Sequence, residues 1–241
     1  FADTEGGSSG SPVMDYNSNF VIAIHNTGFC PNGSHARSDQ LISSIGSDMP
    51  ANGIGGGGGP DPDPGCSSTV SSFPYSESFE ANDGWTQATG DDGNWVRDSG
   101  GTPSNSTGPS NGADGSFYMF LEASTNGSTG QIGANATAIL QSPCFDLSGL
   151  SSASFSFSNH MYGSNMGSLS LEASTNGTSW TSIWSQSGNQ GNQWNNVSVD
   201  LGAYTGQSEL KLRFVGTTGS SWQSDLAIDN LELTTGGGGP G

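Results

Sequence analysis

Basic side chains are almost absent from this sequence. Its 241 residues include four Lys and Arg against 22 Asp and Glu, so the formal net charge at pH 7 is −18. Proteins that bind a nucleic-acid backbone or an anionic membrane surface need clustered Lys and Arg. The charge therefore argues against both kinds of partner. It fits a protein that is soluble in a salty exterior medium, or one in which some carboxylates converge on a cation.

Long hydrophobic runs and closely spaced cysteine pairs of the metal-binding type are also missing. No stretch approaches the run of about 18 apolar residues that indicates a membrane-spanning helix, and no signal peptide is present. We therefore expect either a cytoplasmic chain or a processed, exported one. The cysteines are Cys30, Cys66 and Cys144. An odd number in an exported chain predicts one disulfide and one cysteine whose partner is missing. Few lysines and abundant Gly, Ser, Thr and Asn favour export.

What the sequence does contain is glycine, at 39 residues, and short runs in which apolar and polar residues alternate. Phe155 and Phe157 alternate with serines, and residues 210–214 show the same period of two. This period is typical of half-buried antiparallel strands. Only 11% of the residues are charged, too few for a coil kept open by repulsion. Many such strands without a helical segment predict an all-β protein with a two-sheet antiparallel sandwich.

A Gly- and Pro-rich stretch divides the chain. Residues 47–65 include the run GIGGGGGPDPDPG, in which flexible glycines precede stiff alternating prolines. We expect a linker there, and the start of another at residues 236–241. The first unit is then residues 1–46, too short for a self-sufficient core, and the second is residues 66–235. Within the first unit, residues 19–30 predict a buried strand and residues 38–46 a short helix.

A serine lies among glycines near the start of the chain, where residues 6–12 read GGSSGSP. A serine hydroxyl needs a nearby base and N–H donors for the oxyanion before it acts as a nucleophile. This stretch and VIAIH at residues 21–25 resemble the nucleophile region of chymotrypsin-fold serine peptidases, in the form of bacterial glutamyl and lysyl endopeptidases. The resemblance implies a fragment of a trypsin-like β-barrel over residues 1–46. It makes Ser9 the nucleophile, with the Gly7 and Ser9 amides as the oxyanion hole.

The same resemblance implies that Thr4, His25 and Asn26 line the pocket that selects a peptide or protein substrate. In this family the base histidine and its acid precede the serine, yet the eight residues before Ser9 include no His. We therefore expect a chain that is inactive alone and belongs to a longer endopeptidase, whose missing part would also hold the partner of Cys30. The alternative is an ordinary Gly- and Ser-rich loop.

The second unit carries a longer series of motifs. Residues 73–233 contain, in order, SFEANDGW, DDGNWVRD, SFYMFLEA, ILQSPCFDLSG and DLAIDNLEL. They resemble a MAM domain, an extracellular adhesion module. The resemblance implies a jelly-roll sandwich with a structural cation, calcium, whose ligands here would be Glu80, Asp91 or Asp92, and Asp229. The alternative for Asp91 and Asp92 is a solvated loop. The apolar alternation also changes parity after Asp229, which predicts a β-bulge there.

The resemblance further leads us to expect a disulfide between Cys66 and Cys144. It places Trp85, Trp95 and Trp194 in the core, whereas one or two other indole rings could lie exposed and stack on sugars. The sequence thus predicts the C-terminal part of a secreted serine endopeptidase, whose calcium-stabilised MAM-like domain holds it to a protein or polysaccharide surface. One alternative is a non-catalytic adhesion or structural protein with a peptidase remnant. Another is a carbohydrate-binding jelly roll.

Overall fold

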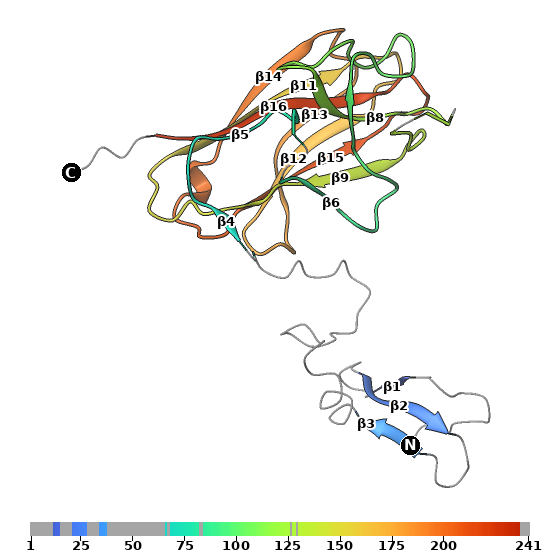
Figure 1. Ribbon diagram of the computed structural model, residues 1–241, viewed down its shortest axis with the longest axis vertical. Helices are drawn as coiled ribbons and strands as arrows, with labels where there is room; N and C mark the ends of the chain where they lie inside the picture. The colour runs from blue at the N-terminus through green and yellow to red at the C-terminus, as the bar shows by residue number, and fades with distance from the viewer. Residues whose placement is uncertain are drawn as a thin grey trace. The chain divides into compact units, whose positions relative to one another are not determined.

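The chain forms two units, Phe1–Asp61 and Pro62–Gly241, in the computed structural model. The structure describes residues 12–14, 21–27, 34–37, 66, 68–81, 84–125, 127–128 and 130–236. In the first unit, three strands pair antiparallel in the order β1-β2-β3 (Figure 1). Their bounds are β1 Pro12–Met14, β2 Val21–Thr27 and β3 Ser34–Arg37. Strand β2 confirms the strand expected there, whereas the expected helix at residues 38–46 lies outside the described residues.

The second unit is a sandwich of two mainly antiparallel sheets (Figure 1). The larger sheet has the order β14-β11-β16-β8-β7, with β5 also paired to β16. Its strands are β5 (Tyr75–Glu77), β7 (Val96–Ser99), β8 (Phe117–Leu121), β11 (Ala153–Met161), β14 (Trp194–Asp200) and β16 (Leu226–Thr235). The predicted all-β sandwich is confirmed for this unit.

The smaller sheet has the order β13-β12-β15-β9-β6. Its strands are β6 (Thr86–Gln87), β9 (Thr137–Gln141), β12 (Ser168–Ser174), β13 (Thr181–Ser187) and β15 (Lys211–Thr217). Two short strands, β4 (Thr69–Val70) and β10 (Cys144–Phe145), pair in parallel, and a single turn of 3₁₀ helix, η1, spans Gly202–Tyr204. The described part of the chain contains no helix with the length and apolar content to span a membrane.

Aromatic rings from both sheets fill the interior of the sandwich. Phe155 and Phe157 of β11 and Phe214 of β15 are almost completely buried. The ring of Phe157 lies 4.9 Å from that of Phe214 and 5.0 Å from that of Trp184. Full burial of one such side chain contributes about 2–3 kcal/mol to stability. The alternation of Phe and Ser in the sequence therefore produces the contact that joins the two layers.

The predicted disulfide is present. Cys66 and Cys144, 78 residues apart in sequence, form a bond between the segment that precedes β4 and the start of β10. A covalent link across so many residues stabilises a fold mainly by restricting the unfolded chain. It fixes the beginning of the second unit to the strand with which β4 pairs.

Strand β16 contains the predicted bulge. Ser156 of β11 lies opposite Glu232, and Ser158 lies opposite Asp229, so three steps along β16 match two along β11. Asn230, within the bulge, has a φ of 52°. The extra residue reverses the alternation, so Leu226 and Ile228 before it and Leu231 and Leu233 after it all join the core. Asp229 is left on the outer face of the larger sheet.

Candidate functional site

Residues 100–116 connect β7 to β8 and cover the outer face of the larger sheet. We call this segment the β7–β8 connection. Beneath it lies a second apolar cluster of buried side chains, formed by Tyr118, Phe120 and Ala227. The Tyr118 hydroxyl donates a hydrogen bond to the Gly100 carbonyl at 2.9 Å, and the indole N–H of Trp194 donates to the Asn111 carbonyl at 2.9 Å. The connection is therefore a fixed part of the fold, although it contains no strand or helix.

Two of the predicted ligand residues hold the C-terminal half of this connection. The buried Asp229 accepts the backbone N–H groups of Ala113 and Asp114 on Oδ2, at 2.6 and 2.9 Å. The exposed Glu80 accepts those of Ser116 and Phe117 on Oε1, at 2.5 and 2.7 Å. Both carboxylates thus contact one short segment, residues 113–117, from different sides of the chain.

The two carboxylates experience opposite electrostatic environments. The N–H groups of Phe117 and Ser116 hold the pKa of Glu80 below its ordinary value. Burial raises the pKa of Asp229 to about 6, although its N–H donors oppose the rise, and the neighbouring Asp114 carboxylate adds to it. Asp114 was not among the predicted ligands. The only signal for it was its position in the loop immediately before β8.

Asp91 and Asp92 lie elsewhere in the sandwich. Asp91 accepts the backbone N–H of Ile139 on Oδ2 at 2.8 Å, and Asp92 accepts that of Thr137 at 2.8 Å. Their partners belong to β9 in the smaller sheet, whereas Glu80 and Asp229 hold the connection on the larger one. Among the residues described, no three His, Cys, Asp or Glu side chains gather so that they could hold a metal ion.

The predicted peptidase residues are only partly covered by the structure. Ser9, Gly7 and Thr4 lie outside the described residues. His25 and Asn26 are in β2, where the backbone of His25 lies opposite that of His35. The positions of their side chains are not described, so the roles of all five residues stay predictions.

A second feature of the outer surface is an open hollow of about 460 Å³ around Trp222. We call it the Trp222 pocket. Its lining consists of Pro103, Ser104, Asn105, Ser124, Thr125 and Trp222. Trp222 is 46% exposed and is the one exposed large hydrophobic side chain in the part of the chain that the structure describes. The other lining residues are small or polar, and none of them is charged.

The remaining tryptophans have structural roles or are partly buried. Trp95 is buried and donates its indole N–H to the Ala138 carbonyl at 3.1 Å. Trp85 packs against the core and Trp194 against the cluster beneath the β7–β8 connection. Trp180, half-buried, lies against the guanidinium of Arg213, 4.2 Å from its ring centroid. Trp222 is therefore the ring available to an external ligand.

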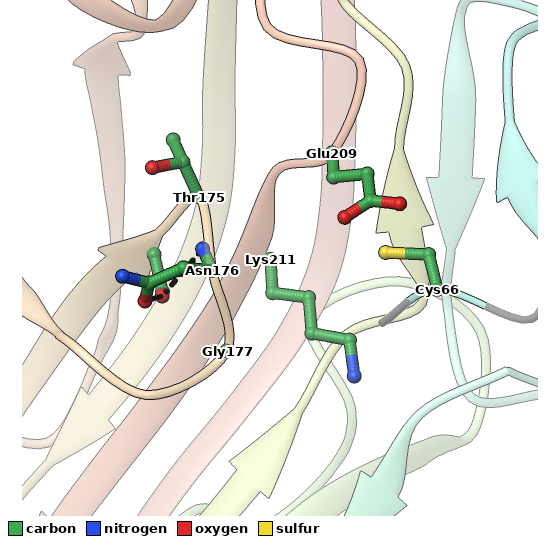
Figure 2. Close-up of a pocket in the computed structure, with 7 residues that line it drawn as sticks. Cys66, Thr175, Asn176, Gly177, Glu209 and Lys211 are labelled. Carbon is green, nitrogen blue, oxygen red and sulfur yellow. Dashed lines mark hydrogen bonds between the residues drawn. The ribbon is translucent and has the colours of Figure 1, made fainter. Parts of the chain in front are cut away.

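A smaller hollow lies beside the disulfide. Figure 2 shows Glu209 and Lys211 between the turn at Asn176 and Gly177 and the sulfur of Cys66. Its volume of about 10 Å³ has room for one water molecule. Asn176 already uses its side-chain oxygen to accept the backbone N–H groups that follow it in the turn. This hollow is too small for a partner's side chain.

We expect substitution of Asp229 to release the β7–β8 connection. Asp229→Ala leaves three N–H groups at the edge of the sheet without their acceptor, because Asn230 also donates to this carboxylate at 2.7 Å. The free energy of unfolding should fall by about 3 kcal/mol, as measured by urea denaturation of the full chain. Asp229→Asn keeps one acceptor oxygen and should cost less. Equal stability of all three proteins would show that this carboxylate does not hold the segment.

Comparison with known proteins identifies the second unit. The family model of the MAM domain, meprin/A5/mu, matches residues 78–237. The MAM domain-containing glycosylphosphatidylinositol anchor protein 1 of Rattus norvegicus is 34% identical over 165 residues, which cover 64% of this chain and 16% of that protein. Protein 2 of the same name from Mus musculus is 31% identical over 191 residues, covering 70% and 19%. The chain therefore spans less than a fifth of the length of these vertebrate relatives.

A solved structure supports the fold. The K1 cleaved adhesin domain of Lys-gingipain from Porphyromonas gingivalis superposes with a TM-score of 0.51 at 18% sequence identity, over 69% of this chain and 100% of that one. At this identity the likeness concerns the fold alone. The family model, by contrast, matches most of the chain through its sequence. The chain belongs to the MAM domain family.

Proposed function

We propose that residues 66–236 form an extracellular binding domain that holds its parent protein to a protein or polysaccharide surface. Membership of the MAM family and the Cys66–Cys144 disulfide support an extracellular location, since structural disulfides persist in oxidising compartments. Relatives that carry a glycosylphosphatidylinositol anchor in their names support a cell-surface setting. The observation that carries the proposal is the exposed Trp222 in a neutral pocket.

The chemistry of the Trp222 pocket fits a binding role. Tryptophan is enriched among the residues that contribute most to binding energy, because a large rigid ring loses little entropy when it is covered. Beside the ring, Asn105, Ser104 and Thr125 offer amide and hydroxyl groups. The apolar face of a sugar ring stacks on an indole while its hydroxyls bond to such groups. This arrangement makes a polysaccharide a candidate ligand in addition to a protein.

Trp222→Ala should weaken binding to the surface partner at least tenfold, because it removes the ring and leaves the lining groups. The measurement is a glycan array together with adhesion to immobilised extracellular proteins. Trp180→Ala is the matched control, since it removes a ring outside the pocket and should bind like the wild type. If both variants bind like the wild type, the pocket is not the binding surface. If the wild-type protein binds glycans but none of the immobilised proteins, the domain binds carbohydrate rather than protein.

A structural calcium ion at Glu80 and Asp229 belongs to the same proposal. The available donors are oxygens, which calcium prefers, and the carboxylates of Glu80 and Asp229 both accept N–H groups of residues 113–117. The raised pKa of the buried Asp229 indicates a charge that lacks compensation. Asp91 and Asp92 contact β9 instead, so they do not complete this set. The ion would fix the C-terminal half of the β7–β8 connection.

We expect Glu80→Gln to reduce the rise in melting temperature that calcium produces, because it removes one ligand charge but keeps an acceptor oxygen for Ser116 and Phe117. Differential scanning calorimetry of the full chain in calcium and in chelator measures this rise. Glu232→Gln, a loss of equal charge on β16, is the control and should respond like the wild type. A calcium response that is absent from all three proteins would contradict the site.

We also propose that residues 1–46 are the end of a bacterial-type serine endopeptidase domain with Ser9 as its nucleophile. The GGSSGSP motif supports this, and so does the antiparallel order β1-β2-β3 that follows it. The test is fluorophosphonate labelling of the protein as isolated from its source, followed by mapping of the labelled residue. Label on Ser9 supports a working peptidase. A companion Ser9→Ala protein should take up none. Failure of the natural protein to label would leave a remnant without activity.

A further inference from the structure

Two more carboxylates lie buried at the edge of the Trp222 pocket. Glu122 directly follows β8 and Asp225 directly precedes β16. Leu121 lies opposite Leu226 in the antiparallel ladder. Glu122, one residue later, therefore lies opposite Asp225, one residue earlier, on the outer face of the sheet. Both Glu122 and Asp225 are 0% exposed. Two carboxylates are thus enclosed side by side.

Each carboxylate is held through one oxygen atom. Oε1 of Glu122 accepts the Ser104 hydroxyl at 2.6 Å and the Ser124 backbone N–H at 3.1 Å. Oδ1 of Asp225 accepts the Ala123 backbone N–H at 3.0 Å. The second oxygens, Oε2 of Glu122 and Oδ2 of Asp225, have no hydrogen-bond partner, and neither does the buried Oγ of Ser124. Three shielded oxygen atoms in one neighbourhood are therefore unsatisfied, which is costly in a native protein.

Within the described part of the second unit, no Lys or Arg side chain pairs with these two carboxylates. The three basic residues of the second unit lie elsewhere: Arg97 beside Glu80, Arg213 in a 2.7 Å ion pair with Glu172, and Lys211 in the hollow of Figure 2. Burial raises the pKa of Asp225 to about 7, the Ala123 N–H opposes the rise, and the Glu122 carboxylate adds to it. Because both carboxylates are fully enclosed and one oxygen of each lacks a partner, the pair needs a proton or a cation to offset its charge.

We propose that Glu122 and Asp225 bind a divalent cation, calcium, with the Ser124 hydroxyl as a neutral ligand. The three unsatisfied atoms are all oxygens, the ligands that calcium prefers, and no nitrogen or sulfur donor of the zinc type joins them. A shared proton would satisfy the two carboxylate oxygens and leave the Ser124 hydroxyl without a partner. A cation satisfies all three. This site is distinct from the one proposed at Glu80 and Asp229.

The cation has a consequence for the surface above it. Ser104 and Ser124 both contact Glu122, and both line the Trp222 pocket. An ion that fixes the Glu122 carboxylate therefore also fixes two of the groups that a ligand would meet. Calcium then strengthens binding at the pocket, a coupling that rests on the proposed binding function. The presence of the ion itself does not rest on it.

The test is isothermal titration calorimetry of calcium into the metal-free full chain at pH 7.5. A Glu80→Gln background weakens the other proposed site, because it removes one of that site's ligand charges. We expect this single variant to bind one calcium ion, and the double variant Glu80→Gln/Glu122→Gln to bind it at least tenfold more weakly. Glu80→Gln/Glu232→Gln is the matched control for charge and should keep the full affinity. The readout needs no partner molecule, so it is independent of whether the pocket binds a surface.

Either of two results would overturn the proposal. One is the absence of calcium binding in the Glu80→Gln protein. The other is equal affinity in the single and double variants. In that second case the two carboxylates share a proton. The free energy of unfolding of the Glu80→Gln protein should then fall as the pH rises from 4 to 7, and it should fall less when Glu122→Gln is added. If Glu122→Gln does not fold, Ser124→Ala in the same background replaces it, with an expected several-fold loss of calcium affinity. Unchanged affinity there equally overturns the site.

Discussion

Hydrogen bonds from backbone N–H groups to carboxylates hold the β7–β8 connection on the larger sheet, and the outer surface of the domain depends on them. The connection has to cover the apolar cluster of Tyr118, Phe120 and Ala227. As an irregular segment it lacks a ladder partner for its own N–H groups, so these groups bond to other acceptors. Asp229 and Glu80 supply these acceptors near β8. Nearer the start of the connection, the Ser104 hydroxyl donates a hydrogen bond to the Glu122 carboxylate.

The use of carboxylates as acceptors places negative charge on the larger sheet, and this charge needs compensation. In the described part of the second unit, Arg213 pairs with Glu172 and Arg97 lies beside Glu80, so neither compensates the buried carboxylates of the larger sheet. An unpaired buried charge is expensive, so the carboxylates must take protons or cations from the solvent. Extracellular modules bind calcium with dissociation constants of about 10⁻⁴–10⁻³ M, weak enough to respond to the medium. The acidic composition and the proposed location outside the cell would then share one physical explanation.

Local patterns in the sequence predicted the sandwich well and the site only in part. Alternation of Phe155 and Phe157 with serines identified β11 and its core face, and the change of parity after Asp229 identified the bulge. The hydrogen-bond partners of Asp91 and Asp92 could not be predicted from local patterns. The partner of an acidic turn depends on which distant strand lies beside it. Glu122 could not be predicted as buried either. Its burial requires the β7–β8 connection to cover a face that alternation alone marks as solvent-exposed.

Strand β16 links these features, because its two faces serve different purposes. Leu226 and Ile228 point into the core, whereas Asp225, Ala227 and Asp229 alternate with them on the outer face. The small side chain of Ala227 separates the two carboxylates and leaves room for the cluster under the connection. The bulge then returns Leu231 to the core, so Asp229 can face outward without loss of interior packing. One strand thereby sets both the register of the sandwich and the spacing of its buried carboxylates, which couples the stability of the core to the shape of the proposed binding surface.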